Sequence, residues 1–120
     1  EALLTGHIGK FVKLSGGMMN THSREGDCRA ELMAAAALRA GADADTARAM
    51  FDCVTTDEML RILEEKGLLE GTMDALKERI EFSLNARVKG RLKLGVIVFT
   101  GGGTELFKTD TAKAWTEERA

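Results

Sequence analysis

The sequence predicts an α/β domain that is rich in helices and contains an open sheet with at least two parallel strands. Apolar runs at residues 2–5 and 94–99 are each followed by a glycine turn and then by helix-like sequence, so the order strand, turn, helix occurs twice. Most of the sequence between them has helical periodicity. With 120 residues, 44% of them hydrophobic, residues 1–120 are expected to form one domain with its own core, in a Rossmann-like arrangement.

The first expected elements are the end of a strand and a short helix. The sequence begins at Glu1 without an initiator methionine and continues directly with the apolar residues Ala2-Leu3-Leu4. We interpret these first residues as the end of a strand that belongs to a longer protein. The helix is predicted from apolar or small residues spaced by threes and fours: Ile8, Phe11, Val12 and Ser15. Gly16 and Gly17 are expected to close it. A strand over the same residues is the alternative, because Val12 and Leu14 alternate with Lys13.

Three further helices are predicted from their caps. Ser23 is a candidate N-cap for an alanine-rich helix that stops at Gly41, where a left-handed residue can end it. Asp43 is expected to cap the next, short helix. Thr55 with Glu58 three residues later has the form of a capping box, which predicts a third helix.

The longest periodic run follows Gly67 and extends from Leu69 to Arg87, with charged residues on the opposite face. The helical rhythm ends at residues 94–99, LGVIVF, which are apolar on both faces and rich in β-branched residues. Such a segment is typical of a central strand buried between two layers. A glycine turn at residues 101–103 and a last helix over residues 110–118 complete the expected fold.

The two strand ends predict a binding edge. Ligands in open α/β sheets lie beyond the carboxyl ends of the strands, where Gly6, Gly9 and the turn Gly101-Gly102-Gly103 are expected. Glycines let a ligand approach the backbone, and free amides at a helix N-terminus favour an anion. We therefore expect a ligand to meet the backbone at this edge.

Composition narrows the function classes. The 17 basic and 19 acidic residues nearly balance and form no basic stripe, so a nucleic-acid partner is not expected. No apolar stretch approaches the roughly 20 residues of a membrane helix, and no signal peptide opens the chain, which predicts a soluble, cytoplasmic protein without a membrane partner. Cys28 and Cys53 lack metal-ligand spacing, so we expect reduced thiols and no metal site.

Several segments, in order, resemble a known family. Residues 6–23 read GHIGKFVKLSGGMMNTHS and are followed by an alanine-rich helix, VTTDE at residues 54–58 and VIVF at residues 96–99. This resembles the C-terminal region of the CbiD-type cobalt-precorrin-5B C1-methyltransferases. The resemblance implies transfer of a methyl group from S-adenosylmethionine to ring carbon 1 of a cobalt-bearing tetrapyrrole, giving cobalt-precorrin-6A in anaerobic cobalamin biosynthesis. It also implies that the family's N-terminal domain is missing from this chain.

Candidate roles follow from this chemistry. Methyl transfer is an in-line displacement that depends mainly on positioning. His7 or His22 is the natural general base if a proton must leave the macrocycle. The carboxylates of a tetrapyrrole would be bound by basic residues, namely Lys10, Lys13, Arg24 and Arg29. Neutral hydrogen bonds would come from Asn20, Thr21 and Ser23. Backbone access for the cofactor or the ring would come from the glycines, namely Gly6, Gly9, Gly16, Gly17, Gly101, Gly102 and Gly103.

Each candidate also has a structural interpretation. Ser23 can serve only as an N-cap, Lys13 can be a solvated charge on a helix, and each histidine can simply bond a neighbouring loop. Residues 55–57 are interpreted as the start of a helix. The turn at residues 101–103 can be a loose surface turn, because it lacks the spaced GxGxxG pattern.

Two alternative functions for the whole chain stay open. One is a non-catalytic module that binds an anionic ligand or assembles with another domain. The other is an independent dinucleotide-binding domain, which would need a longer parallel sheet. A homo-oligomer is also possible on the sequence, because the alanine-rich helix and the helix from Leu69 can pack within the chain or against another copy.

Overall fold

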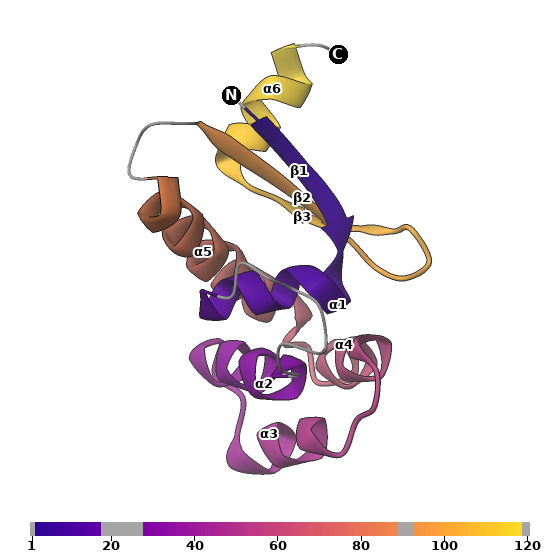
Figure 1. The fold of residues 1–120 in the computed structure, drawn as a ribbon. Coiled ribbons are helices and arrows are strands. Elements are labelled where there is room, and N and C mark those ends of the chain that lie inside the picture. The colour runs from indigo at the N-terminus through magenta and orange to yellow at the C-terminus, as the bar shows by residue number, and fades with distance from the viewer. Residues whose placement is uncertain (1, 18–27, 89–92, 119–120) are drawn as a thin grey trace.

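The computed structural model describes residues 2–17, 28–88 and 93–118. A small sheet with helix α6 occupies one end of the molecule, helices α2, α3 and α4 occupy the other, and α5 and the segment α1–η1 lie between them (Figure 1). The helices are α1 (Ile8–Phe11), the 3₁₀ helix η1 (Val12–Gly16), α2 (Arg29–Arg39), α3 (Ala44–Phe51), α4 (Thr56–Glu65), α5 (Leu69–Val88) and α6 (Asp110–Glu118).

The sheet has three strands in the order β1-β2-β3. Strand β1 (Ala2–His7) pairs in parallel with β2 (Leu94–Phe99), in a register that places His7 beside Phe99. Strand β2 is central and its four middle residues are buried, because an apolar, β-branched strand has neighbours on both faces. The predicted parallel pair and central strand are confirmed.

The third strand corrects one prediction. The turn at residues 101–103 does not lead into a helix, since it connects β2 to the antiparallel strand β3 (Glu105–Lys108). The turn closes through a hydrogen bond of 2.8 Å from the Thr100 N–H to the Thr104 carbonyl, and Gly103 has a φ of +89°. The described sheet is therefore mixed, and the Rossmann-like arrangement is not confirmed.

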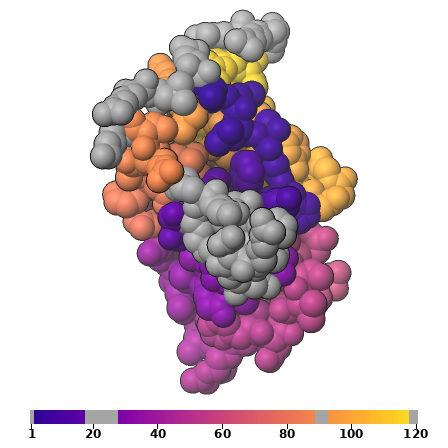
Figure 2. Space-filling model, in the orientation of Figure 1, coloured from indigo at the N-terminus to yellow at the C-terminus, as the bar shows by residue number. Residues whose placement is uncertain are grey.

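Strand β1 lies at the edge of the sheet. Its residues alternate between half-buried and exposed, and Figure 2 shows the strand at the surface. The helix predicted after it is present as α1 followed by η1, so the alternative of a strand over these residues is wrong. Gly17 ends η1 with a φ of +80°, a conformation that glycine adopts without steric cost.

The caps of the middle helices are mostly as predicted. Asp43 accepts a hydrogen bond of 2.8 Å from the Thr46 N–H at the start of α3. At the start of α4, the Thr55 hydroxyl accepts from the Glu58 N–H at 3.2 Å and donates to the Glu58 carboxylate. Helix α2 differs, because it begins at Arg29 with Cys28 as its N-cap residue. Ser23, the predicted cap, is therefore not its cap and lies outside the described residues.

Helix α5 organises the core. Its apolar stripe is buried against η1, α2 and β3, as the periodicity predicts. The largest fully buried apolar side chains come from all the layers, and include Ile8, Met33, Met50, Met59, Leu63, Leu76, Ile80, Val96 and Val98. One aromatic residue of α5, Phe82, points outward and is 60% exposed.

Candidate functional site

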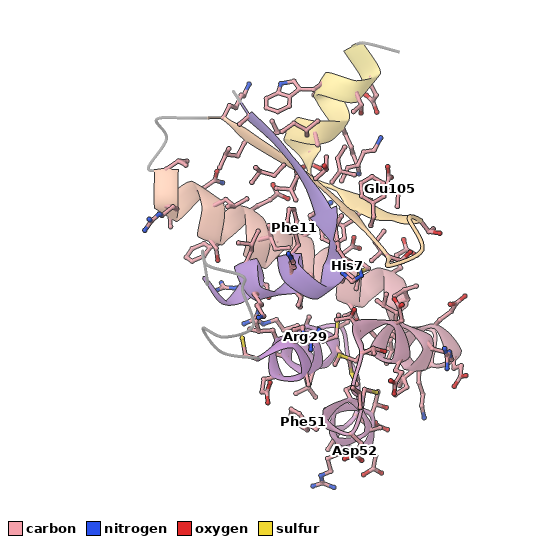
Figure 3. The ribbon with its side chains drawn as sticks, turned by 45° about the vertical axis from the view of Figure 1, so that its right-hand side comes forward. His7, Phe11, Arg29, Phe51, Asp52 and Glu105 are labelled. Atoms are coloured by element: carbon pink, nitrogen blue, oxygen red, sulfur yellow. The ribbon has the colours of Figure 1, made fainter. Side chains whose placement is uncertain are left out.

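His7 stands where β1 ends and α1 begins (Figure 3). Its Nδ1 accepts a hydrogen bond of 2.7 Å from the backbone N–H of Gly9, so the imidazole is the N-cap of α1. Because Nδ1 accepts, the neutral ring carries its proton on Nε2. The fold therefore leaves Nε2 as the ring nitrogen available for other partners.

The second glycine turn meets His7 at the same edge. A Cβ atom built on Gly101 would lie 3.0 Å from His7 Nε2 and 3.2 Å from Asp57 Oδ2. Strand β1, the hairpin turn and the start of α4 therefore converge at one place. The predicted meeting of the two glycine turns at the carboxyl edge of the parallel strands is present in the structure.

Asp57 and Thr56 join this edge from α4. Asp57 is exposed, whereas Thr56 is buried and its Oγ1 lies 3.6 Å from the position of a Cβ on Gly9. The sequence interpretation of residues 55–57 as a helix start holds for Thr55, which is the cap. It missed the proximity of Asp57 to His7, and the signal that could have revealed it was the TTDE segment within the family resemblance.

The glycines around His7 have packing roles. A Cβ on Gly6 would lie 2.6 Å from the ring of Phe11, which folds back over β1. A Cβ on Gly9 would lie 2.9 Å from His7 Nδ1. Both distances are too short for real side-chain contacts, so these positions need glycine to seat the phenyl ring and the imidazole.

The two lysines that sequence reasoning paired are in different environments. Lys10 is exposed on α1, next to the His7 edge. Lys13 is only 1% exposed and interacts within the protein, so its interpretation as a solvated charge is wrong. Arg29 is half-buried at the start of α2. The other predicted residues of this set, Asn20, Thr21, His22, Ser23 and Arg24, lie outside the described residues.

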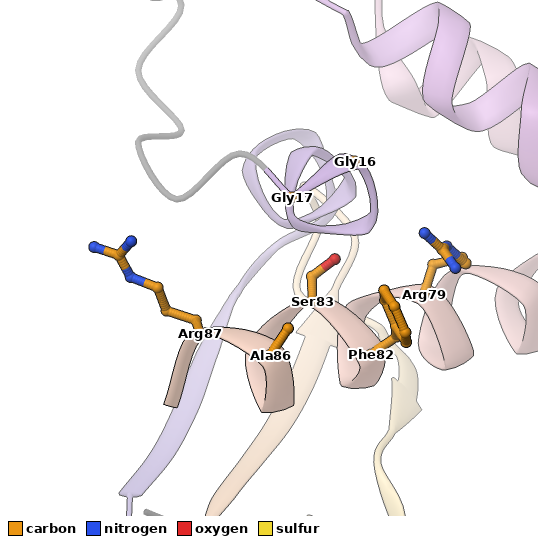
Figure 4. A pocket seen from close by; sticks show the side chains of 7 residues that line it. All are labelled: Gly16, Gly17, Arg79, Phe82, Ser83, Ala86 and Arg87. Atoms are coloured by element: carbon orange, nitrogen blue, oxygen red, sulfur yellow. The ribbon is translucent and has the colours of Figure 1, made fainter. Parts of the chain in front are cut away.

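Gly16 and Gly17 lie at the far end of the segment α1–η1 from His7, so the predicted cofactor glycines divide between two places. They border an open groove of about 410 Å³ against α5 (Figure 4). The α5 residues that line it are Arg79, Phe82, Ser83, Ala86 and Arg87. None of these was singled out from the sequence, because the groove forms only when η1 packs on α5.

A second cavity, of about 490 Å³, adjoins the hairpin turn. Thr100 and Thr104 border it, together with apolar residues of α4, α5 and β3. Its charged lining residues are all acidic: Glu64, Glu70, Asp74 and Glu105. The cavity therefore combines apolar walls with negative charge, which suits a cationic ligand that has an apolar body.

Cys28 and Cys53 are half-buried reduced thiols, and reduced thiols are what the sequence predicted. Burial, with the nearby carboxylates of Glu58 and Asp52, raises the pKa of the Cys53 thiol above its ordinary value.

Across residues 2–17, 28–88 and 93–118, no cluster of three or more histidine, cysteine, aspartate or glutamate side chains is arranged to hold a metal ion. In the same residues, no helix has the length and apolarity needed to cross a membrane.

The fold and this edge define a class of protein, a helix-rich α/β domain with a polar site at the carboxyl ends of a parallel strand pair. The family model described as CbiD, C-terminal domain, matches residues 20–110. The chain therefore belongs to the CbiD family, and corresponds to its C-terminal domain.

Curated relatives agree with this assignment. Proteins named cobalt-precorrin-5B C(1)-methyltransferase are 41% identical over 104 residues in Ruminiclostridium cellulolyticum and 38% identical over 106 residues in Methanocaldococcus jannaschii. These matches cover 87% and 88% of this chain, but only 27% and 29% of the relatives. A Methanococcus maripaludis protein of the same name is 34% identical over 92% of this chain. No solved structure matches the chain significantly.

Proposed function

We propose that the chain is the C-terminal domain of an enzyme that methylates ring carbon 1 of cobalt-precorrin-5B, giving cobalt-precorrin-6A. The main support is the match of most of the chain to relatives with this activity in their name. The alternative of a non-catalytic assembly module is not favoured by these matches. The further domain that such an enzyme needs would come from the part of the relatives that this chain does not span.

The methyl donor in this proposal is S-adenosylmethionine, which supplies an activated methyl group on a sulfonium cation. The acidic, partly apolar cavity beside Thr100 fits such a cation, because carboxylates attract it and apolar walls cover its body. Five glycines lie in the two turns at the strand edge around His7, namely Gly6, Gly9, Gly101, Gly102 and Gly103. Two more, Gly16 and Gly17, border the groove between η1 and α5. These seven positions stay proposed as places where the ligands meet the backbone.

His7 is the proposed acid–base residue at the edge. In the described geometry its Nε2–H points to the side on which Asp57 and Gly101 lie, so the ring can donate a hydrogen bond there. To accept a proton at Nε2, the ring would have to give up its bond to the Gly9 N–H and carry its proton on Nδ1. His22 is a second candidate for the same role.

The substrate's carboxylates would be bound by basic residues near this edge. Lys10 supports the proposal directly, since it is exposed one turn after His7. Lys13, Arg24, Asn20, Thr21 and Ser23 stay candidates for substrate binding. Burial of Lys13 means that it would act by holding η1 in place unless binding uncovers it.

The rest of the enzyme is the proposed partner. Strand β1 has one open edge in the described sheet, and further parallel strands there would complete a Rossmann-like sheet. Exposed apolar side chains at Leu38, Phe51 and Val54 offer additional contact area for that part or for a second copy. We place the enzyme in the cytoplasm, where a diffusible biosynthetic intermediate would be available.

The test is methyl transfer by the full-length protein that carries this domain. Purified enzyme is given methyl-labelled S-adenosylmethionine and cobalt-precorrin-5B, and the labelled product is identified by mass spectrometry. We expect one methyl group on ring carbon 1 with the wild type, and much slower turnover with His7→Ala. Lys66→Ala, an exposed change at the end of α4, is the matched control. Absence of transfer by the wild-type enzyme would contradict the proposal.

A further inference from the structure

The groove between η1 and α5 carries two arginines on one face of a helix. Arg79, Ser83 and Arg87 are spaced by four residues, and Figure 4 shows their side chains on the side of α5 that faces Gly16 and Gly17. Arg87 follows Arg79 by eight positions in the helix, so their Cα atoms are about 12 Å apart. The groove therefore has a positive charge toward each end.

Neither charge is held in an ion pair within the described part of the chain. Arg79 and Arg87 form no ion pair with a described carboxylate. The Nε atom of Arg79 is screened from solvent and has no hydrogen-bond partner there, which is uncommon for a buried donor. In general, an arginine guanidinium can form two parallel hydrogen bonds with the two oxygens of a carboxylate.

An aromatic ring lies between the two charges along the helix. The Arg79 guanidinium carbon is 4.6 Å from the centroid of the Phe82 ring, which holds the cation at the groove. The ring itself is 60% exposed, whereas the other large apolar side chains of this helix are buried or half-buried. An exposed ring beside unpaired arginines provides a flat apolar surface with anion donors at its margin.

We propose that this groove binds a broad macrocyclic ligand that carries carboxylates at its periphery, with Arg79 and Arg87 each taking a carboxylate and Phe82 contacting an apolar face of the ring system. The identity of that ligand rests on the proposed function, since the tetrapyrrole substrate is a macrocycle with peripheral carboxylates. Arg79, Phe82 and Arg87 are then substrate-binding residues. The acidic cavity beside Thr100 repels the peripheral carboxylates of the same ligand, so these carboxylates favour the groove over that cavity.

The experiment is a spectroscopic titration of the chain with uroporphyrin, a planar macrocycle with peripheral carboxylates. We expect saturable binding that weakens with salt, and affinity lower by about tenfold in Arg79→Gln and in Arg87→Gln, the size of one charge-assisted hydrogen bond. The double variant should lose about a hundredfold, because well-separated changes add. Arg87→Glu, at an exposed position, should lower the affinity for uroporphyrin more than Arg87→Gln does, without affecting folding.

The matched control removes the same charge elsewhere. Arg48 and Arg61 are exposed on α3 and α4 and do not line the groove, so the Arg48→Gln/Arg61→Gln variant should bind uroporphyrin like the wild type. A porphyrin with cationic side chains should show no loss of affinity in any groove variant. Circular dichroism verifies that each variant is folded.

Two results would overturn the inference. One is failure of the wild-type chain to bind uroporphyrin, and the other is equal affinity of the groove double variant and the control double variant. A methyl-transfer assay of the full-length enzyme distinguishes failure of the groove assignment from failure of the proposed function. If that enzyme methylates its substrate with an unchanged KM when Arg79 and Arg87 are both glutamine, the groove assignment is wrong and the proposed function stands.

Discussion

His7 Nδ1 and the backbone N–H of Gly9 are joined by a hydrogen bond of 2.7 Å. This bond links the end of β1 to the start of α1 and sets the ring so that Nε2 faces the hairpin turn and Asp57. The same side chain thus caps the first turn of α1 and presents its protonated ring nitrogen at the carboxyl end of β1. Its structural and its proposed chemical role can be separated by changing its neighbours.

Gly9→Ala tests the cap. A Cβ atom there would lie 2.9 Å from His7 Nδ1, so the ring must leave its position and the Gly9 N–H loses its acceptor. We expect a loss of about 1 kcal/mol in the free energy of unfolding, the usual size of a lost N-cap. Nitrogen-15 NMR of the imidazole should show that Nδ1 no longer accepts a hydrogen bond.

The matched control for this change is Gly102→Ala. The nearest atom to a Cβ on Gly102 is Thr100 Oγ1, at 3.8 Å, which is an ordinary contact. We expect an unchanged His7 spectrum in that variant. If Gly9→Ala leaves both stability and spectrum as in the wild type, the imidazole is not a cap in solution.

Substitutions at Asp57 and at Thr55 should have different effects, the first on activity and the second on stability. Asp57→Asn removes a charge beside His7 and leaves the Thr55 cap of α4 intact, so we expect slower methyl transfer with little change in melting temperature. Thr55→Ala removes the cap and should cost about 1 kcal/mol of stability without lowering turnover of the folded enzyme. Thermal unfolding and turnover are measured on both variants. Equal turnover in Asp57→Asn and the wild type would remove Asp57 from the site.

Much of the fold is readable from local chemistry. Asp43 and Thr55 cap helices as predicted, because an N-cap is decided by residues three positions apart. Strand β2 was predictable because a run that is apolar on both faces needs cover on both sides. Strand β3 was not, since its four residues form a short edge strand whose pairing depends on the hairpin turn.

The candidate site also has features that the sequence predicted and features that it did not. The glycine turns around His7 and Gly101 were expected at one edge because parallel strands end together. Burial of Lys13 and exposure of Phe82 could not be read from periodicity, because both depend on how η1 packs on α5. The partners of long-range contacts are set by tertiary packing, and local spacing does not specify them.

Glu81 should make stability depend on pH. Burial, followed by repulsion from Asp110, raises the pKa of Glu81 above its ordinary value of 4.5, and Glu78 adds to the repulsion. The opposing attraction comes from two lysines, Lys77 and Lys113. Because the folded state holds this proton more tightly than the unfolded state, stability falls as pH rises from 4.5 through the folded-state pKa.

Glu81→Gln should abolish that part of the pH dependence. We expect the variant to melt at a higher temperature than the wild type at pH 7, and the difference to disappear or reverse below pH 4, where Glu81 is protonated in both states. Thermal unfolding across this pH range measures it. Asp74→Asn, at an exposed position two turns earlier on α5, is the control for loss of one carboxylate. A pH-independent difference between Glu81→Gln and the wild type would contradict the prediction.

Cys53 should react slowly with alkylating agents at neutral pH. Burial raises the pKa of its thiol above the ordinary value of 9.0, and Glu58 and Asp52 raise it further, so less of the reactive thiolate is present at neutral pH than in an ordinary cysteine. Glu58→Gln removes one of the charges while glutamine can still serve at this position of a capping box. We expect iodoacetamide to alkylate Cys53 faster in this variant, with its pH–rate profile displaced to lower pH. Mass spectrometry of the Cys53 peptide gives the rate, and Glu65→Gln, an exposed change at the end of α4, is the control. Identical profiles for Glu58→Gln and the wild type would mean that burial alone sets the reactivity of this thiol.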